Sequence, residues 1–204
     1  GMSTLNIFIA NELSGMYIDM TKDSLYCNAK NDPRRMASQS AMAMITKSLL
    51  LLMAPILTYT ADEILEHSPA IIKGEANSIF DLVYENIETG TSEFNAEYMT
   101  KAREGFGSIV DSLKKEKTIK STLELVISTD STIALGIDSI DAEDWFVVST
   151  VSDAQITEEL GSFKVDNDTF IIAKATASKC PRCWKFQATA EDCTCTRCES
   201  VISA

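Results

Sequence analysis

The sequence predicts a protein of several domains, with an α-helical bundle first, a small α+β domain next and a short cysteine-rich domain last. Three observations support this fold class. Apolar residues before residue 70 recur at helical spacing, and three segments rich in Val, Ile, Phe and Thr follow residue 120. Five of the six cysteines lie between residues 180 and 198. A chain of 204 residues is long enough for two or three small domains.

Residues 1–70 are expected to form the helical bundle. One apolar face recurs at spacings of three or four residues, through Leu5, Ile9, Leu13, Met16 and Met20. A second helix is expected to begin at Pro33 with Asp32 as its N-cap, because proline suits the first turn and aspartate accepts free backbone N–H groups. The run Leu49–Leu57 is apolar on all sides, which predicts a buried helix, and Pro55 is expected to kink it.

The middle of the chain is expected to contain a connecting segment, 71–93, and an α+β domain, 94–176. Helical spacing of apolar residues predicts a helix over 94–117. β-Branched and aromatic residues predict strands over 121–129, 145–151 and 168–176, with a short helix over 131–140. The order helix, strand, helix, strand, strand is typical of a small α+β unit.

Residues 177–204 contain two C-x-x-C pairs, which predict a zinc knuckle or ribbon. A C-x-x-C turn lets two thiolates converge on one ion, and two turns complete a tetrahedral shell. We therefore expect one structural zinc held by Cys180, Cys183, Cys195 and Cys198, because a closed four-thiolate shell leaves no position for water. Cys193 is the spare thiol, although Cys193-x-Cys195 is a competing pair. A redox dithiol or disulfides are the alternatives to zinc.

The charge of the chain restricts its partners. A net charge of −12 argues against indiscriminate binding to nucleic acid. The segments 19–47, 101–120 and 179–198 nevertheless carry more basic than acidic residues, so a polyanion could be held locally. The longest apolar run has nine residues, too few to span a bilayer, and no export signal is visible, so we expect a cytoplasmic protein without a membrane segment.

Trp184 follows the second cysteine and has basic neighbours in Arg182, Lys185 and Arg197. Aromatic side chains among basic ones can stack on and neutralise single-stranded nucleic acid. The alternative is that Trp184 is a hydrophobic lid on a small core. The lone histidine, His67, is expected to end a helix rather than to act in catalysis, and Cys27 is expected to be a core residue.

Three sequence blocks together resemble the C-terminal third of bacterial isoleucyl-tRNA synthetases. The blocks are "KDSLYC" (22–27), "RRMASQSAMAMITKSLLLLMAPILTYTADEILEHSP" (34–69) and "KCPRCW" with "CTRC" (179–198). The first two are similar to the anticodon-binding bundle of the class I synthetases for isoleucine, valine and leucine. The cysteine block narrows the resemblance to the isoleucine enzymes, and the stretch 94–120 resembles their junction domain.

This resemblance implies binding to the anticodon stem-loop of isoleucine tRNA, in a monomer that works with the remainder of a synthetase chain. Lys22, Arg34 and Arg35 are the expected contacts to phosphates or bases, with solvated helix ends as the alternative interpretation. Arg182 and Trp184 are expected to meet the loop from the zinc side. Ser24 stands where the family has a basic residue in "KDRLY", which removes one expected phosphate contact.

The sequence lacks the family motifs HIGH and KMSKS, which bind ATP and stabilise the adenylate transition state. We therefore expect this chain not to activate isoleucine, and ATP and isoleucine to be ligands of a full-length enzyme only. A zinc-ribbon module that binds DNA or protein is the main rival, but it leaves the block 34–69 unexplained and predicts no preference for tRNA. A thiol oxidoreductase would instead need a C-x-x-C thiol of depressed pKa and no tightly held metal.

Overall fold

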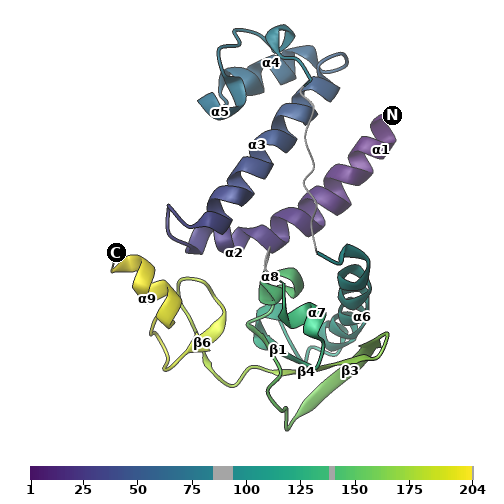
Figure 1. Ribbon diagram of the computed structural model, residues 1–204, viewed down its shortest axis with the longest axis vertical. Coiled ribbons are helices and arrows are strands. Elements are labelled where there is room, and N and C mark those ends of the chain that lie inside the picture. Colours follow the sequence, from purple (N-terminus) through teal and green to yellow (C-terminus); the bar gives the residue numbers. More distant parts are fainter. Residues whose placement is uncertain (85–93, 138–140, 204) are drawn as a thin grey trace. The chain divides into compact units, whose positions relative to one another are not determined.

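The computed structural model describes residues 1–84, 94–137 and 141–203 of the chain (Figure 1). It contains two compact units, one formed by residues 1–29 together with 93–204 and the other by residues 30–92. The residues predicted as one bundle, 1–70, are thus divided between the two units. The mixture of N-terminal helices, a small sheet and four close cysteines at the end confirms the predicted fold class.

The first unit begins with three helical segments in direct succession, α1 (Met2–Ile7), η1 (Phe8–Ile18) and α2 (Asp19–Cys27), of which η1 is π-helical. The chain leaves α2 at Asn28, whose backbone is extended. Met20 on α2 packs into the core of the α+β domain, and Cys27 at its end packs among the C-terminal cysteines. The helix therefore links two parts of the unit that lie far away in the sequence.

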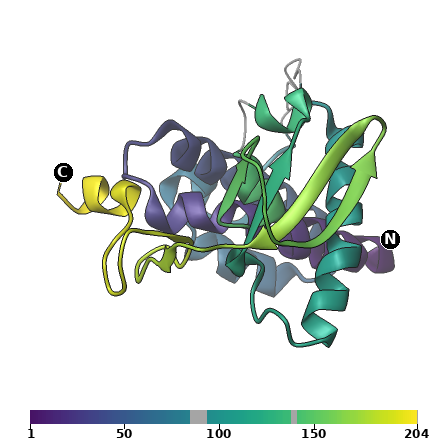
Figure 2. The same ribbon diagram turned by 90° about the horizontal axis from the view of Figure 1, so that it is seen from below.

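A four-stranded sheet and one long helix form the α+β domain. The strands β1 (Leu125–Thr129), β2 (Thr150–Ser152), β3 (Glu159–Val165) and β4 (Asp168–Lys174) lie in the order β2-β1-β4-β3. β1 and β2 are parallel and the other pairs are antiparallel. The register places Ile127 between Val151 and Ile172, so three aliphatic side chains lie side by side across the sheet. Figure 2 shows α6 (Ala96–Lys115) along one face of the sheet.

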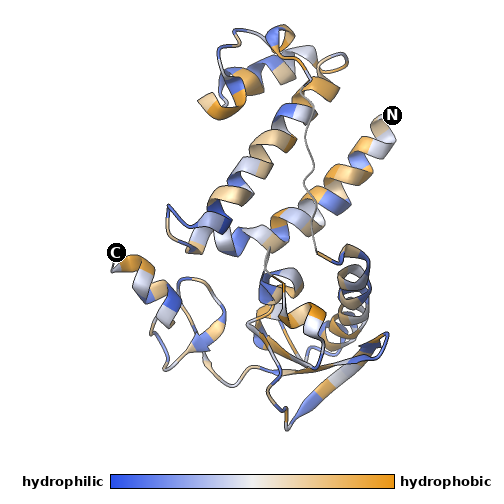
Figure 3. Ribbon diagram, in the orientation of Figure 1, coloured by the Kyte–Doolittle hydropathy of each residue, from blue (hydrophilic) through white to orange (hydrophobic). Residues whose placement is uncertain are grey.

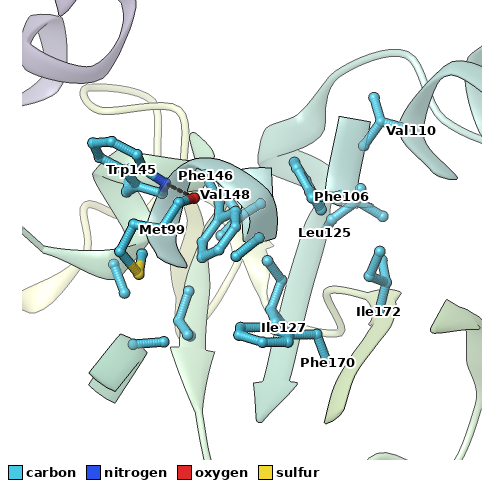
Figure 4. Close-up of a cluster of buried hydrophobic side chains, with 14 of the residues drawn as sticks. Met99, Phe106, Val110, Leu125, Ile127, Trp145, Phe146, Val148, Phe170 and Ile172 are labelled. Carbon is cyan, nitrogen blue, oxygen red and sulfur yellow. Dashed lines mark hydrogen bonds between the residues drawn. The ribbon is translucent and has the colours of Figure 1, made fainter. Parts of the chain in front are cut away.

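The expected strand over 145–151 is only partly present. Trp145 and Phe146 belong to the short helix α8 (Ala142–Phe146), and β2 begins only at Thr150. The indole Nε1 of Trp145 donates a hydrogen bond to the backbone oxygen of Met99, 3.0 Å away, inside the buried cluster of Figure 4. Burial of both aromatic rings from one helical turn thus outweighs their preference for strands. Val147 then takes a left-handed backbone with φ of 56°, which ends the helix.

Two further elements differ from the expectation, and three short ones complete the first unit. A 3₁₀ turn, η3 (Thr122–Glu124), replaces the start of the first predicted strand. The helix predicted over 131–140 is α7 (Thr132–Leu135), and residues 138–140 lie outside the described residues. The C-terminal part contains β5 (Ser178–Lys179), β6 (Phe186–Ala188) and the helix α9 (Thr196–Ile202).

The second unit is helical, with α3 (Pro33–Met53), α4 (Thr58–Glu66), α5 (Ala70–Lys73) and the 3₁₀ turn η2 (Ile79–Asp81). Asp32 caps α3 as predicted, since its Oδ1 accepts hydrogen bonds from the backbone N–H groups of Arg34 and Arg35 at 3.0 and 3.1 Å. The chain does not kink at Pro55. It ends α3 two residues earlier and begins α4 three residues later, because proline lacks the N–H and clashes with the preceding turn.

The prediction that Leu49–Leu57 is buried is wrong for much of the run. Leu50 and Ala54 pack with residues of α4 and η2, whereas Leu52 and Ile56 are 53% and 61% exposed. A unit this small can cover only one face of such a helix, and hydrophobic residues recur along α3 in Figure 3. Among the described residues, one helix, α3, is long and apolar enough to cross a membrane. Length and composition alone are weak evidence for a membrane segment.

Candidate metal centre and the surface around it

Four cysteines converge near the end of the chain, and we call them the cysteine cluster: Cys180, Cys183, Cys195 and Cys198. Their sulfur atoms all lie within 4.8 Å of one another, and all four side chains are buried. The Sγ atoms of Cys183 and Cys195 are 3.7 Å apart. Sulfurs held tetrahedrally about 2.3 Å from an ion lie ~3.8 Å apart, whereas a disulfide needs about 2.05 Å. The donor set and its spacing therefore fit a bound metal ion such as zinc.

Local backbone hydrogen bonds explain how the two knuckles form. The backbone N–H of Trp184 donates to the Cys180 oxygen at 3.0 Å, and the Cys180 N–H donates to the Lys185 oxygen at 2.9 Å. Trp184 takes a left-handed backbone with φ of 67°, which closes this first turn. Cys195 is the N-cap of α9, and its N–H points to the Cys180 sulfur at 3.4 Å. The hairpin and the helix start thus each contribute two ligands.

The electrostatics of the cluster favour a thiolate at Cys180. Burial raises the pKa of this thiol, but hydrogen bonds from the backbone N–H groups of Cys183 and Cys195 lower it to about 6. A redox dithiol would share this feature, whereas the convergence of four sulfurs is typical of a metal site. Cys193 is exposed and lies outside the cluster. Cys27 is buried beside it, and burial together with the charge of Asp23 raises its pKa to about 11.

Two basic residues that flank the cysteines form ion pairs within the protein. Lys185 is 5% exposed, and its Nζ donates to Asp144 Oδ1 at 2.8 Å and lies 3.5 Å from Asp23 Oδ2. Arg197 binds the Asp23 carboxylate with both terminal nitrogens. Burial lowers the pKa of Lys185, but the two carboxylates outweigh it and the pKa is raised. These ion pairs attach the segment 178–202, which we call the knuckle segment, to α2 and α8.

The five residues predicted to contact tRNA occupy different places. Arg34 and Arg35 begin α3 in the second unit, and the other three, Lys22, Arg182 and Trp184, line one pocket in the first unit. Lys22 pairs with Asp19 on the surface of α2. Arg182 Nη1 donates to the Cys27 oxygen at 2.7 Å and to the Cys198 sulfur at 3.4 Å. Arg182 therefore fixes the cysteine cluster to α2, a role that sequence reasoning missed.

Trp184 is 60% exposed, so it does not act as a lid on a hydrophobic core. The ammonium group of Lys179 lies 5.5 Å from the centroid of its ring, which is within the range of a cation–π contact. Trp184 also lines both of two neighbouring hollows. The indole is consequently available to a ligand.

The pocket shared by Lys22, Arg182 and Trp184 has a volume of about 670 Å³. It lies between α2, the end of α6 with the loop after it, and the knuckle segment. Sequence reasoning missed three residues that line it, Tyr26, Lys114 and Lys120. The basic stretch 101–120 was a signal for the two lysines, but nothing in the sequence placed them beside the cysteines.

Comparison with known proteins adds to this geometry. Residues 2–129 match the family model described as the anticodon-binding domain of tRNA ligase. The isoleucine–tRNA ligase of Sulfurimonas denitrificans is 61% identical over 204 residues, and that of a Sulfurovum species is 53% identical over the same length. That of a Nitratiruptor species is 54% identical over 202 residues, or 99% of the chain. The chain spans 22% of the length of each of these relatives.

Proposed function

Because the chain belongs to the family of anticodon-binding domains of tRNA ligases, we propose that it binds isoleucine tRNA through the anticodon stem-loop. The match of residues 2–129 to that domain family carries the proposal. Relatives named as isoleucine–tRNA ligases, similar over the whole chain, support isoleucine tRNA as the specific partner. A DNA-binding or protein-binding zinc ribbon has no such support.

We also propose that the chain works in the cytoplasm, as a monomer and within a longer ligase. Its similarity covers 22% of relatives that carry the name of the ATP-dependent enzyme. Its own sequence has neither of the two motifs that bind ATP in the family. The other residues of the ligase would then carry out aminoacylation, and this chain would contribute binding of the tRNA.

The expected roles of the contact residues follow from their chemistry. Lys22, Arg34 and Arg35 suit phosphates of the loop, because they are cations at or near helix ends. Trp184 suits a splayed base, because unpaired loop bases stack on exposed aromatic rings. Arg182 has five N–H donors, and Nη1 is engaged by Cys27 and Cys198. It can hold the knuckle segment and still offer donors to RNA.

One zinc ion in the cysteine cluster would have a structural role. Four thiolates complete its shell and leave no position for a reacting water, so the ion contributes folding free energy rather than chemistry. The protein side chains then determine where the knuckle segment lies. Lys185 and Arg197 attach it to α2, which presents Trp184 at the pocket.

The test is a titration of labelled anticodon stem-loops, isoleucine and non-cognate, at several salt concentrations. We expect weak binding with preference for the isoleucine loop, because a chain of net charge −12 offers only small basic regions. Each phosphate contact should contribute roughly 0.7 to 0.9 to the slope of log affinity against log salt. Arg34→Ala should weaken both RNAs and flatten that slope, whereas Lys164→Ala on β3 serves as the charge-matched control. Equal affinity for all loops would contradict the proposal.

A further inference from the structure

We propose that Arg182 and Arg197 couple metal binding in the cysteine cluster to the folding of the last turn of α2. Each arginine contacts both the sulfur shell and the end of the helix, so the end of α2 is held in place only while the shell is complete. This coupling is separate from tRNA binding and requires only that zinc occupies the cysteine cluster, as proposed above.

The two knuckles share a feature that their cysteines alone do not explain. The first reads C-P-R-C and the second C-T-R-C, so an arginine precedes the second cysteine of each. Arg182 Nη1 donates a hydrogen bond to the sulfur of Cys198, in the opposite knuckle, at 3.4 Å. Arg197 interacts in turn with the first knuckle: the Asp23 carboxylate raises the pKa of Arg197 most, burial lowers it, and the Cys183 side chain raises it further. Each arginine therefore reaches from its own knuckle to the other.

The charge of a filled shell explains why cations are needed at this place. Four thiolates around one divalent ion leave an excess of two negative charges, and all four side chains are buried. A buried charge is costly unless it is paired and hydrogen-bonded. Arg182 forms no ion pair with a carboxylate among the described residues, so its charge is available to the thiolates. The Nε atom of Arg197 is buried and has no hydrogen-bond partner in the described part of the chain, so this N–H group is available as a further donor.

The same two arginines bond the end of α2, whose last residue is Cys27. The last carbonyl groups of a helix have no partner within the helix. Arg182 Nη1 donates to the Cys27 carbonyl oxygen at 2.7 Å, and Arg197 Nη1 donates to the side-chain oxygen of Asn28 at 3.4 Å. A cation also suits this end because the C-terminus of a helix carries partial negative charge. The knuckle segment thus supplies the C-terminal cap of α2, with Arg182 155 residues further along the chain than Cys27.

The last turn of α2 has little support of its own. It contains no basic residue that could bond the free carbonyl groups. The backbone N–H of Asn28 closes this turn on the Ser24 oxygen at 3.3 Å. Helix ends open at little cost in free energy unless other contacts hold them. Loss of the two arginine contacts should therefore let the helix fray from Ser24 onward.

The coupling acts in both directions. The binding free energy of a structural zinc ion is also folding free energy, because the ion draws together knuckles that would otherwise separate. Without the ion, Arg182 and Arg197 lose their fixed positions beside α2. By reciprocity, an ordered end of α2 holds the arginines where they favour the metal shell, so it raises the affinity for zinc.

The first experiment compares hydrogen exchange in the zinc-loaded and the metal-depleted chain. We expect removal of zinc to speed exchange about ten-fold or more at the amides of residues 24–28. The amides of Phe106 and Val110 on α6 are the internal control and should not change, because both residues lie in the core of the α+β domain. Equal protection of residues 24–28 with and without zinc would overturn the proposal.

The second experiment separates the arginine from the metal. Arg182→Met removes both hydrogen bonds and keeps all four cysteines, so residues 24–28 should exchange nearly as fast in the zinc-loaded variant as in the metal-free chain. Its zinc affinity, measured by competition with a coloured chelator, should fall about ten-fold, since a hydrogen bond to a charged group is lost. Arg182→Lys keeps the charge and should recover much of that affinity. Lys179→Met is the matched control, because this cation of the knuckle segment lies against the Trp184 ring. The same behaviour of Arg182→Met and Lys179→Met would contradict the role of Arg182.

The third experiment tests the reverse direction, from the helix to the metal. Asp23→Ala removes the carboxylate that holds Arg197 on α2 and should lower the zinc affinity several-fold, although Asp23 is not a ligand. Asp19→Ala, one helical turn earlier and paired with Lys22, should leave the affinity unchanged. Equal zinc affinities of the two variants would refute the coupling. A chain that binds no zinc would refute the metal assignment and this proposal with it, whereas a zinc-loaded chain that binds no tRNA would refute only the proposed function.

Discussion

Replacement of Asp23 by alanine tests whether ion pairs hold the knuckle segment on α2. The Asp23 side chain is 15% exposed and accepts a hydrogen bond from Arg197 Nη2 at 2.9 Å, and its Oδ2 lies 3.5 Å from Lys185 Nζ. Burial raises the pKa of Asp23, but the hydrogen bond and charges of Arg197 and Lys185 lower it overall. The carboxylate is therefore held in its charged form by the two cations that the variant would leave behind.

The expected loss of stability can be worked from the exposure of those cations. Breaking a fully buried pair costs about 3–5 kcal/mol, because the remaining charge is uncompensated. Arg197 is 33% exposed and can be rehydrated in part, and Lys185 keeps Asp144 at 2.8 Å. We therefore expect Asp23→Ala to lower the free energy of unfolding by about 2–4 kcal/mol. At ~2–4 °C per kcal/mol for a chain of this size, a loss near 3 kcal/mol lowers Tm by roughly 6–12 °C.

The assay is thermal unfolding of the zinc-loaded chain, with hydrogen exchange at the amides of the knuckle segment. Asp19→Ala is the matched control, because Asp19 lies one helical turn earlier and its partner Lys22 is 49% exposed. Exposed pairs contribute about 0–1 kcal/mol, so the control should change Tm by no more than a few degrees. If Asp23→Ala and Asp19→Ala give the same Tm and the same exchange rates, the network does not attach the knuckle segment to the helix.

Three further predictions concern the metal, a helix and a phenol. We expect one zinc per chain by metal analysis, lost on serine substitution of any member of the cysteine cluster but kept in Cys193→Ser; loss only in Cys193→Ser would contradict this ligand set. Gly107→Ala should stabilise the chain by up to about 1 kcal/mol in denaturant unfolding, because nothing lies within 4 Å of the added Cβ. Gly105→Ala should be less stable than Gly107→Ala by about 1–3 kcal/mol, since its Cβ would meet the Phe163 ring at 2.6 Å, and equal stabilities would show that the ring yields freely. Burial and the hydrogen bond to Asp168 raise the pKa of Tyr98 to about 12. Because the phenol loses its proton near pH 10 in the unfolded chain, this group makes the free energy of unfolding fall between about pH 10 and 12. Tyr98→Phe should lessen that fall and remove the last step of the ultraviolet titration of the tyrosines. An unchanged titration would refute this prediction.

Much of the fold could be predicted from local patterns in the sequence. The paired C-x-x-C spacing predicted four cysteines that do converge, because each turn fixes two sulfurs within a few residues. Asp32 before Pro33 predicted the start of α3 for the same reason, since a cap and its helix are neighbours in the sequence. The strand over 168–176 was predicted well because its β-branched and aromatic residues face a buried sheet position.

Predictions failed where distant contacts decide the outcome. Residues 145–151 have strand composition, yet the indole of Trp145 finds its partner at Met99 and the first two residues become helical. Lys185 was grouped with the basic neighbours of Trp184 that could meet nucleic acid, whereas it is buried and paired with carboxylates from two different helices. The exposure of Leu52 likewise depends on the small size of the second unit, which covers only one face of α3. No local pattern contains this information.

The two parts of the first unit are not synthesised one after the other, so this unit can complete its fold only after the rest of the chain has been made. Asp23 and Arg197 are 174 residues apart, and the whole second unit, residues 30–92, is made between the two parts of the first. Residues emerge from the ribosome N-terminus first, so α2 is made before the residues that pack against it. The described core of the inserted second unit consists of that unit's own residues, so this unit can pack in the meantime. The α+β domain is synthesised next and packs against Met20, and the knuckle segment is synthesised last. A chain released before residue 182 would therefore lack Arg182, Lys185 and Arg197, the three side chains that attach the knuckle segment to α2, and α2 would be secured to the α+β domain alone.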